Sequence, residues 1–339
     1  MVRCGGHTGP STTAPTVASI DPGHGPAGGG TAVHIAGDHF VAGATVMIGG
    51  APATDVVVES ATSITAKTAA HPTGASDVTV TVGGKNGTLP GAFTYDTDTA
   101  PVITSVTAQG TRSHEPRNFA DLDEEVSVTA VVEDPDTPAD RLTFEWSAEV
   151  GAFSGTGATV TWRAPADAST PKAIVLTVKV SDPGSNSTTG TATVSLHNSR
   201  KEVGDLSRQF LLDFSDSKNG AAVVVRNFTK SPRCEADRDE EFNEIDTNRN
   251  TYRITSSNIG PATVNIQFAS LPCSYLPRDG DACASVPSTW DSVCAPGATC
   301  TPGRSQGIDY VTAVYEGTEW KLCASYFQGR TPVQKGFIK

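Results

Sequence analysis

The sequence predicts a mainly β protein: two tandem β-sandwiches followed by a disulfide-rich α+β domain. Three observations lead to this fold class. Apolar and polar residues alternate, with frequent turns, from residue 15 to residue 198. A helical period first appears after residue 198, and six of the seven cysteines follow residue 233. A length of 339 residues suits two or three domains, each large enough to bury its own core.

Composition narrows the class of protein. The chain has 33 Gly and 22 Pro, and only 18% of its residues are charged, a mixture typical of short strands joined by many turns. No apolar run approaches the ~18 residues that a membrane-spanning helix needs. The net charge is −12 and no segment has a basic excess, so we do not expect a nucleic-acid partner.

Residues 1–14 are predicted to be a flexible tether, because Gly, Ser, Thr and Pro follow Cys4 without apolar periodicity. Cys4-Gly5-Gly6 resembles the start of a mature bacterial lipoprotein, which implies lipidation of Cys4 and a place on the outer cell surface. Met1-Val2-Arg3 departs from a lipobox. The alternatives are a lone thiol in a tail, and a secreted or periplasmic protein.

The segment 15–96 reads as a small antiparallel sandwich. Glycine pairs and triplets separate its strands and supply the positive φ values of tight hairpins. The predicted strands are Thr31–Ala36, Thr45–Ile48, Asp55–Glu59, Ser63–Lys67 and Asp77–Val82. The segment resembles the IPT/TIG family of immunoglobulin-like domains in its opening at 15–22, in Gly28-Gly29-Gly30-Thr31, in the stretches 35–40 and 46–50, and in its ending at 89–95. This resemblance implies a fold and no activity.

A second sandwich is predicted for 100–198, after a short hinge over 97–101. Its strands are predicted over Glu125–Val132, Leu142–Trp146, Thr159–Trp162, Ala173–Val180 and Thr191–Leu196. The stretches 132–136, 142–147, 157–162 and 178–182 resemble polycystic-kidney-disease-type and cadherin-like bacterial surface domains. We therefore expect two immunoglobulin-like modules in series.

Acidic residues gather in this second segment. Calcium binds six to eight oxygens from carboxylates and loop carbonyls, which tandem sandwiches can supply where two domains meet. Asp134-Pro135-Asp136 resembles the D-x-D segment of cadherin-like repeats, although the glycine-rich continuation is absent. Calcium at Asp134, Asp136 and Asp182 is one interpretation, and a solubilising acidic face is the other. No other cofactor is expected.

The segment 199–339 changes to a helical period and then to strands. Glu202–Ser215 is predicted as an amphipathic helix, and Ala221–Phe228 suits a helix or a strand. Further strands are predicted over Tyr252–Ser256, Ala262–Phe268, Ile308–Tyr315 and Glu319–Tyr326, with Leu271–Gln306 as a long loop. The pattern weakly resembles a nuclear-transport-factor-type cone, a helix packed on a curved antiparallel sheet.

The C-terminal cysteines are predicted to form up to three disulfides with open connectivity, because zinc would need closer pairs. They are Cys234, Cys273, Cys283, Cys294, Cys300 and Cys323. Disulfides imply an oxidising compartment.

No catalytic motif is present, and the last of the seven histidines is His197. General base chemistry in 199–339 would fall to carboxylates of the acidic run Asp237, Asp239, Glu240 and Glu241. The simpler interpretation of this run is a solvated turn.

The leading hypothesis is a noncatalytic extracytoplasmic protein whose two modules form a stalk for a C-terminal binding domain. Trp290, Arg278 and Tyr275 are expected to be its binding anchors for a surface protein or glycan, or else to cover the core. Only the lipid anchor would touch a membrane. The alternatives are a self-assembling subunit of a surface filament and a secreted enzyme that keeps accessory modules.

Overall fold

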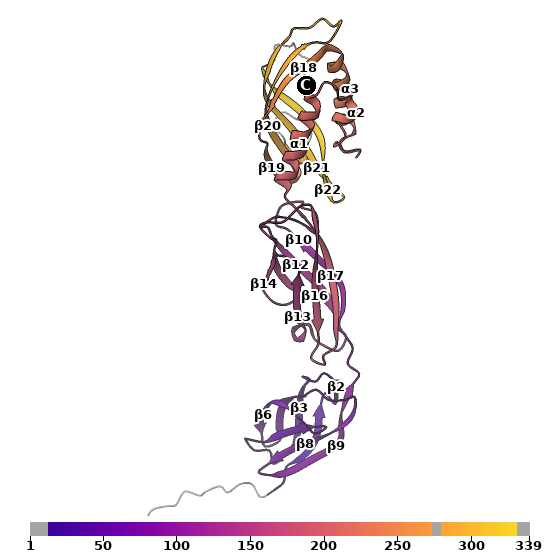
Figure 1. The fold of residues 1–339 in the computed structure, drawn as a ribbon. Coiled ribbons are helices and arrows are strands. Elements are labelled where there is room, and N and C mark those ends of the chain that lie inside the picture. The colour runs from indigo at the N-terminus through magenta and orange to yellow at the C-terminus, as the bar shows by residue number, and fades with distance from the viewer. Residues whose placement is uncertain (1–12, 273–278, 331–339) are drawn as a thin grey trace, which may run out of the picture.

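The fold was analysed in a computed structural model, which describes residues 13–272 and 279–330. Figure 1 shows three bodies in line, with the first sandwich at one end, the second in the middle and the helix-containing domain at the other end. The mainly β fold class is confirmed, with two sandwiches and an α+β domain.

The first sandwich consists of two sheets with strand orders β1-β3-β7-β6 and β2-β9-β8-β4-β5. Val33, Ile35, Ile64 and Val78 alternate inward along their strands and meet Phe93 in the core between the sheets. The strands are β1 (Thr16–Asp21), β2 (His24–Pro26), β3 (Ala32–Asp38), β4 (Thr45–Ile48), β5 (Ala51–Pro52), β6 (Thr54–Ser60), β7 (Ser63–Lys67), β8 (Gly74–Val82) and β9 (Lys85–Asp96).

The second sandwich has strand orders β10-β12-β15-β14 and β11-β17-β16-β13. Trp162 is fully buried between its two sheets and is the largest side chain of the core. The elements are β10 (Val102–Gln109), β11 (Phe119–Asp121), β12 (Glu125–Glu133), the 3₁₀ turn Ala139–Arg141, β13 (Thr143–Ala148), β14 (Ala152–Ser154), β15 (Thr159–Arg163), β16 (Lys172–Ser181) and β17 (Ser187–His197).

In the C-terminal domain three helices lie against a five-stranded antiparallel sheet, as Figure 1 shows. Strands β18 and β19 both pair with β20, which continues through β21 to β22. The elements are α1 (Ser199–Ser215), α2 (Ala221–Val224), α3 (Glu235–Thr251), β18 (Tyr252–Ile259), β19 (Thr263–Pro272), β20 (Asp279–Cys294), β21 (Gly303–Glu316) and β22 (Glu319–Arg330). The ambiguous stretch 221–228 is thus one helical turn followed by Phe228, which bridges to Leu322.

The long loop predicted over Leu271–Gln306 is wrong, because β20 is the central strand of the sheet and β21 begins at Gly303. The buried side chains of β20 include Ala282, Ala284 and Val286, which are too small to give a strong alternation in the sequence. Pro287 lies at the corner where β18 ends and β19 begins, and its oxygen accepts a hydrogen bond from Gly260 N–H there (2.8 Å). A backbone N–H at position 287 would point to the same side as this oxygen, toward the corner between β18 and β19. Proline therefore removes no hydrogen bond from the ladder between β20 and β21.

The acidic run 237–241 is also not a turn, since it lies inside α3. Two disulfides of the predicted set are confirmed: Cys234 joins the start of α3 to Cys323 in β22, and Cys294 joins Cys300. Cys283 is disulfide-bonded as well, and Cys273 lies outside the described residues.

None of the helices in the described ranges has the length and hydropathy that crossing a membrane requires.

Candidate functional site

The second sandwich runs into the C-terminal domain without a linker. Strand β17 ends at His197 and α1 begins at Ser199, with Asn198 as the N-cap whose Oδ1 accepts from Lys201 N–H (3.2 Å). Glu202 Oε1 accepts from Asn198 N–H (2.9 Å), so side chains satisfy two backbone donors at the start of the helix. The last strand of the second sandwich therefore continues directly into the first helix of the C-terminal domain.

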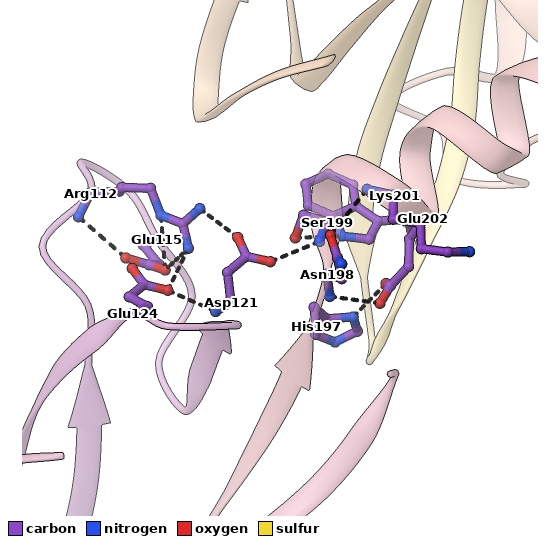
Figure 2. A network of polar contacts seen from close by, with 10 residues as sticks. Arg112, Glu115, Asp121, Glu124, His197, Asn198, Ser199, Lys201 and Glu202 are labelled. Atoms are coloured by element: carbon purple, nitrogen blue, oxygen red, sulfur yellow. Dashed lines mark hydrogen bonds and ion pairs between the residues drawn. The ribbon is translucent and has the colours of Figure 1, made fainter. Parts of the chain in front are cut away.

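A half-buried arginine, Arg112, organises the polar network at this junction (Figure 2). The Arg112 guanidinium donates to Asp121 Oδ2 (2.7 Å), to Glu124 Oε2 (2.8 Å) and to Glu115, whose side chain is fully buried. The second oxygen of Asp121 accepts from Ser199 N–H at the start of α1 (2.8 Å). One carboxylate thus links the arginine of the sandwich to the first helix of the next domain.

The titration behaviour of this network reflects its burial. Burial opposes the charge of Arg112, but hydrogen bonds to Glu115 and Asp121 prevail and raise its pKa. Burial raises the pKa of Glu124 to about 7, although Asp121 N–H and the charge of Arg112 act in the opposite direction.

His197 forms the other half of the network. Its Nδ1 bonds Glu202 Oε2 (2.7 Å), and its Nε2 lies 2.8 Å from Ser195 Oγ and 3.1 Å from the Tyr315 hydroxyl. Burial acts to raise the pKa of Glu202, but hydrogen bonds from His197 and Asn198 outweigh it and hold that pKa below its usual value. His197 therefore joins β17, α1 and β21 at one point.

Aromatic rings continue this contact into the C-terminal core. Phe119 of β11 stacks on His197, with ring centroids 5.1 Å apart, and meets Phe268 and Tyr315 edge to face. The Arg112 guanidinium lies over the rings of Phe119 and Phe268. Phe119 belongs to the same hydrophobic cluster as the C-terminal domain, so the core of that domain extends into the end of the second sandwich, whose own core is separate.

A groove of about 440 Å³ opens beside this contact. Its walls come from both domains and include Arg117, Asn118, Lys172, Thr193, Tyr315 and Thr318. Ligand sites prefer such domain boundaries and lie mostly in the range of about 300–1,000 Å³. The groove therefore has the size and the mixed polar and aromatic lining of a binding site.

A second feature lies inside the C-terminal domain, between α1, α3 and the sheet. Glu241 of α3 and Asp309 of β21 both line a cavity of about 10 Å³, which admits about one water molecule. Ser325 donates to Glu241 and Ser288 donates to Asp309. Burial raises the pKa of Glu241 to about 8 and that of Asp309 to about 7, with the serine bonds acting in the opposite direction. Burial therefore favours the protonated form of both carboxyl groups.

Trp290, one of the predicted binding anchors, lines the same interior cavity and is only 5% exposed. Its ring packs against Phe214 and Phe327, and its indole N–H has no hydrogen-bond partner. Trp290 is thus not a side chain of an exposed loop. The other two anchors, Tyr275 and Arg278, lie outside the described residues, as does Cys4.

The three aspartates predicted to bind calcium do come together, near the end of the second sandwich that faces the first. Asp134 and Asp136 lie just after β12, and Asp182 follows β16. Asp98 of the linker joins them, since the charges of all three act on it. In the conformation seen here, no three or more His, Cys, Asp or Glu side chains of the described residues are placed as metal ligands.

Sequence reasoning missed Arg112, Glu115, Asp309 and Asp98. The sequence around Arg112 and around Asp309 gives no sign of their roles, because their hydrogen-bond partners lie on other elements of the fold. Asp98 did carry a signal: it is an acidic residue in the hinge between two domains, one of which was already expected to bind calcium there.

Comparison with known proteins identifies one segment of the chain. Residues 15–95 match the family model of the IPT/TIG domain, which confirms the resemblance for the first sandwich. No curated protein matches the chain.

Among solved structures, the chain is similar to the plexin A4 extracellular region (23% identity, 48% of this chain and 13% of that chain, TM-score 0.25). It is also similar to the Yersinia pseudotuberculosis adhesin InvE (20% identity, 56% and 61%, TM-score 0.24). A third is the surface glycan-binding protein PbSGBP-B of Prevotella bryantii (17% identity, 55% and 42%, TM-score 0.21). These are partial likenesses of fold alone, and the chain spans only a small part of the length of plexin A4.

Proposed function

We propose that the chain is a noncatalytic extracytoplasmic surface protein, in which two immunoglobulin-like modules form a stalk that presents a C-terminal binding domain. The observation that carries this proposal is that the core of the C-terminal domain extends into the end of the second sandwich. A binding domain fused to its support in this way keeps its orientation. The IPT/TIG module and the disulfides fit a surface location in an oxidising compartment. Lipidation of Cys4 remains the predicted anchor.

The ligand is proposed to bind in the groove at that junction, as a protein segment or a glycan. Tyr315 offers part of an aromatic ring for packing, while Asn118, Thr193 and Thr318 can exchange hydrogen bonds with hydroxyl or amide groups. Arg117 is exposed and makes no ion pair within the described residues, so it is available to a carboxylate. Because both walls are joined by the Arg112 network, little order has to be gained on binding.

The test uses the full oxidised chain on glycan and peptide arrays, followed by calorimetry with the strongest hit. Arg117→Ala and Lys172→Ala should each weaken binding by about tenfold, roughly one charge-assisted hydrogen bond. Lys179→Ala is the matched control, because Lys179 is an exposed lysine of the same strand, β16, outside the groove. The proposal fails if the chain binds nothing on the arrays, or if all three variants bind as the parent does.

One observation favours a second candidate, an enzyme with a carboxylate-dependent site. Glu241 and Asp309 lie near one cavity with raised pKa values, a property of general acids. A structural pair would need only the two serine bonds already present. In an enzyme, Glu241→Gln would abolish turnover of a substrate found by screening while the fold persists. In a binding protein, it would change only the pH dependence of stability.

A further inference from the structure

Three side chains at the C-terminal junction form a chain of hydrogen bonds that ends at the groove. Ser195 and His197 lie on the same face of β17, because residues two positions apart on a strand point the same way. His197 Nε2 lies 2.8 Å from Ser195 Oγ, and His197 Nδ1 lies 2.7 Å from Glu202 Oε2 in the first turn of α1. Figure 2 shows the contact between His197 and Glu202. A hydroxyl, an imidazole and a carboxylate are thus linked in that order.

The carboxylate decides which imidazole nitrogen carries the proton. Burial acts to raise the pKa of Glu202, but hydrogen bonds from His197 and Asn198 outweigh it, so this group is ionised at neutral pH. An ionised carboxylate only accepts hydrogen bonds, and therefore Nδ1 of His197 is the protonated nitrogen. Nε2 keeps a lone pair that faces the Ser195 hydroxyl. In this tautomer the imidazole can act as a base toward the serine.

The serine is the member of this chain that a ligand can reach. Ser195 lines the groove of about 440 Å³ described above, whereas the side chain of His197 is 0% exposed. A neutral imidazole has one donor and one acceptor nitrogen, so Glu202 and the Tyr315 hydroxyl, 3.1 Å from Nε2, would be enough to satisfy a purely structural histidine. The bond to Ser195 exceeds that need and connects the histidine to the groove.

Two hydrogen-bond donors lie beside the serine on the groove wall. One is the Tyr315 hydroxyl. The other is the side-chain amide of Asn118, a residue whose backbone oxygen accepts from Ser195 N–H (2.8 Å). The Asn118 Oδ1 atom accepts from Ala108 N–H (2.9 Å), which leaves the amide N–H groups for a ligand. Donors next to a nucleophile can stabilise the negative charge that develops on a carbonyl oxygen under attack.

We propose that Ser195 is a nucleophile that carboxylic esters acylate in this groove, with His197 as its general base. The Ser195 proton passes to His197 Nε2 as Oγ forms a bond to the carbonyl carbon of the ester. The bond from this carbon to the alcohol oxygen then breaks, and the alcohol leaves with the proton from Nε2. Glu202 is a positioning residue, because it acts only through the imidazole.

The acyl group stays on Ser195. Its hydrolysis needs a water molecule activated by His197 Nε2, and the histidine side chain has no exposed surface. The groove therefore captures the acyl part of its ligand in one covalent step per chain, in the manner of a binding protein. This inference rests on the proposed function, since it assigns a chemical group, a carboxylic ester, to the ligand of the same groove.

The experiment incubates the full oxidised chain with p-nitrophenyl acetate and follows p-nitrophenol release and intact mass. Release should stop at about one equivalent, and peptide mapping by tandem mass spectrometry should place one acetyl group on Ser195. Ser195→Ala should remove this adduct. In Glu202→Gln an amide N–H faces Nδ1, so Nε2 takes the proton and cannot accept from the serine. Acylation of this variant should be slower by about 100-fold or more, while circular dichroism shows the parental fold.

Ser187→Ala is the matched control, because Ser187 is an exposed serine of the same strand outside the groove. Its acylation rate should stay within twofold of the parent rate. The proposal is overturned if the parent gains no acetyl group, or if mapping finds acetyl groups only on other residues. It is also overturned if folded Ser195→Ala or Glu202→Gln is acylated as fast as the parent. Release far beyond one equivalent would overturn the covalent capture.

The outcome is separable from that of the array test. The small probe needs only the serine and its neighbours, so acylation can succeed where the arrays give no ligand, and the groove proposal alone then fails. If an array ligand binds in the groove but Ser195 is never acylated, the assignment of Ser195 alone fails.

Discussion

The two junctions of the molecule treat buried carboxylates in opposite ways. Between the sandwiches and the C-terminal domain, Arg112 and backbone N–H groups bond Asp121 and Glu124, and an aromatic core surrounds them. Between the first and second sandwiches, Asp134, Asp136 and Asp182 act on Asp98, which lines a cleft of about 620 Å³. At the C-terminal junction three carboxylates pair directly with one arginine, Arg112. At the first junction the aspartates are held mainly by backbone and side-chain N–H and hydroxyl donors, and Arg141 acts on Asp98 through its charge.

The largest expected effect comes from removing the arginine that pairs with three carboxylates at the C-terminal junction. Arg112→Ala leaves the buried Glu115 and the half-buried Asp121 and Glu124 without their cation, and should lower the free energy of unfolding by about 3–5 kcal/mol. Urea unfolding of the full chain measures this. Arg163→Ala is the control, because Arg163 pairs with Asp123 and Glu125 on the surface of the same domain and its loss should leave the midpoint unchanged. Equal losses would erase the contrast between the junctions.

The next effect is a pH dependence at the same junction. The pKa of Glu124 is about 7 in the folded chain against about 4.5 when unfolded, so the folded state binds its proton more tightly. The contribution of Glu124 to stability is therefore greatest below about pH 4.5 and falls by about 3 kcal/mol as the pH rises to about 7.

Unfolding free energies measured from pH 5 to pH 8 should show this slope in the parent and a flatter one in Glu124→Gln. Glu125→Gln, one residue away on the exposed side of β12, should keep the parental slope. A Glu124→Gln variant as pH-dependent as the parent would show that another group carries the titration.

A smaller effect is expected from crowding the first junction. In Gly184→Ala the new methyl group meets the Asp98 carboxylate, which must move away from the β16–β17 turn. We expect a loss of about 1 kcal/mol in the unfolding free energy, measured by urea unfolding. Gly23→Ala is the control, since its Cβ would make only ordinary contacts at 3.6 Å or more. An unchanged unfolding midpoint in Gly184→Ala would contradict the close packing of the linker carboxylate on this turn.

The smallest effect concerns Arg141, the lone cation acting on Asp98 in the first junction. Arg141→Ala removes the positive charge that acts on Asp98, so the free energy of unfolding at low salt should fall by about 0.5 kcal/mol, a modest screened interaction. Urea unfolding of the full chain at low and high salt measures it. A loss that persists at high salt would show that Arg141 acts through its packing against Gly30.

The two sandwiches could be predicted because short stretches of sequence carry the signals for their strands and turns. Alternating side chains and hairpin glycines mark strands such as β4 and β7, whose bounds agree with the predicted ranges. Helix α3 was not predictable in this way, since Glu241 and Ile245 are its only buried residues within the described chain. Most of its surface is polar, and the run 237–241 therefore has the composition of a solvated turn.

The candidate site residues also differ in whether the local sequence could predict them. Asp134, Asp136 and Asp182 lie in turns of one domain, where the sequence shows an acidic excess, and the structure brings them together. Glu241 and Asp309 meet only because a helix packs on a sheet, so their sequence neighbours give no hint of the pair. Trp290 was expected on a loop because the polar outer face of β20 hid the strand.

The Cys234–Cys323 disulfide gives the C-terminal domain a mechanical property. A protein that binds a ligand while tethered carries a pulling force along its chain. Cys234 and Cys323 are 89 positions apart in the sequence, and while they are bonded a pulling force cannot extend the segment between them. At about 3.5 Å per extended residue, the disulfide prevents about 310 Å of extension. Under load, most of the C-terminal domain would stay a short, stiff link, and any lengthening would come from the two sandwiches, whose described residues contain no cysteine.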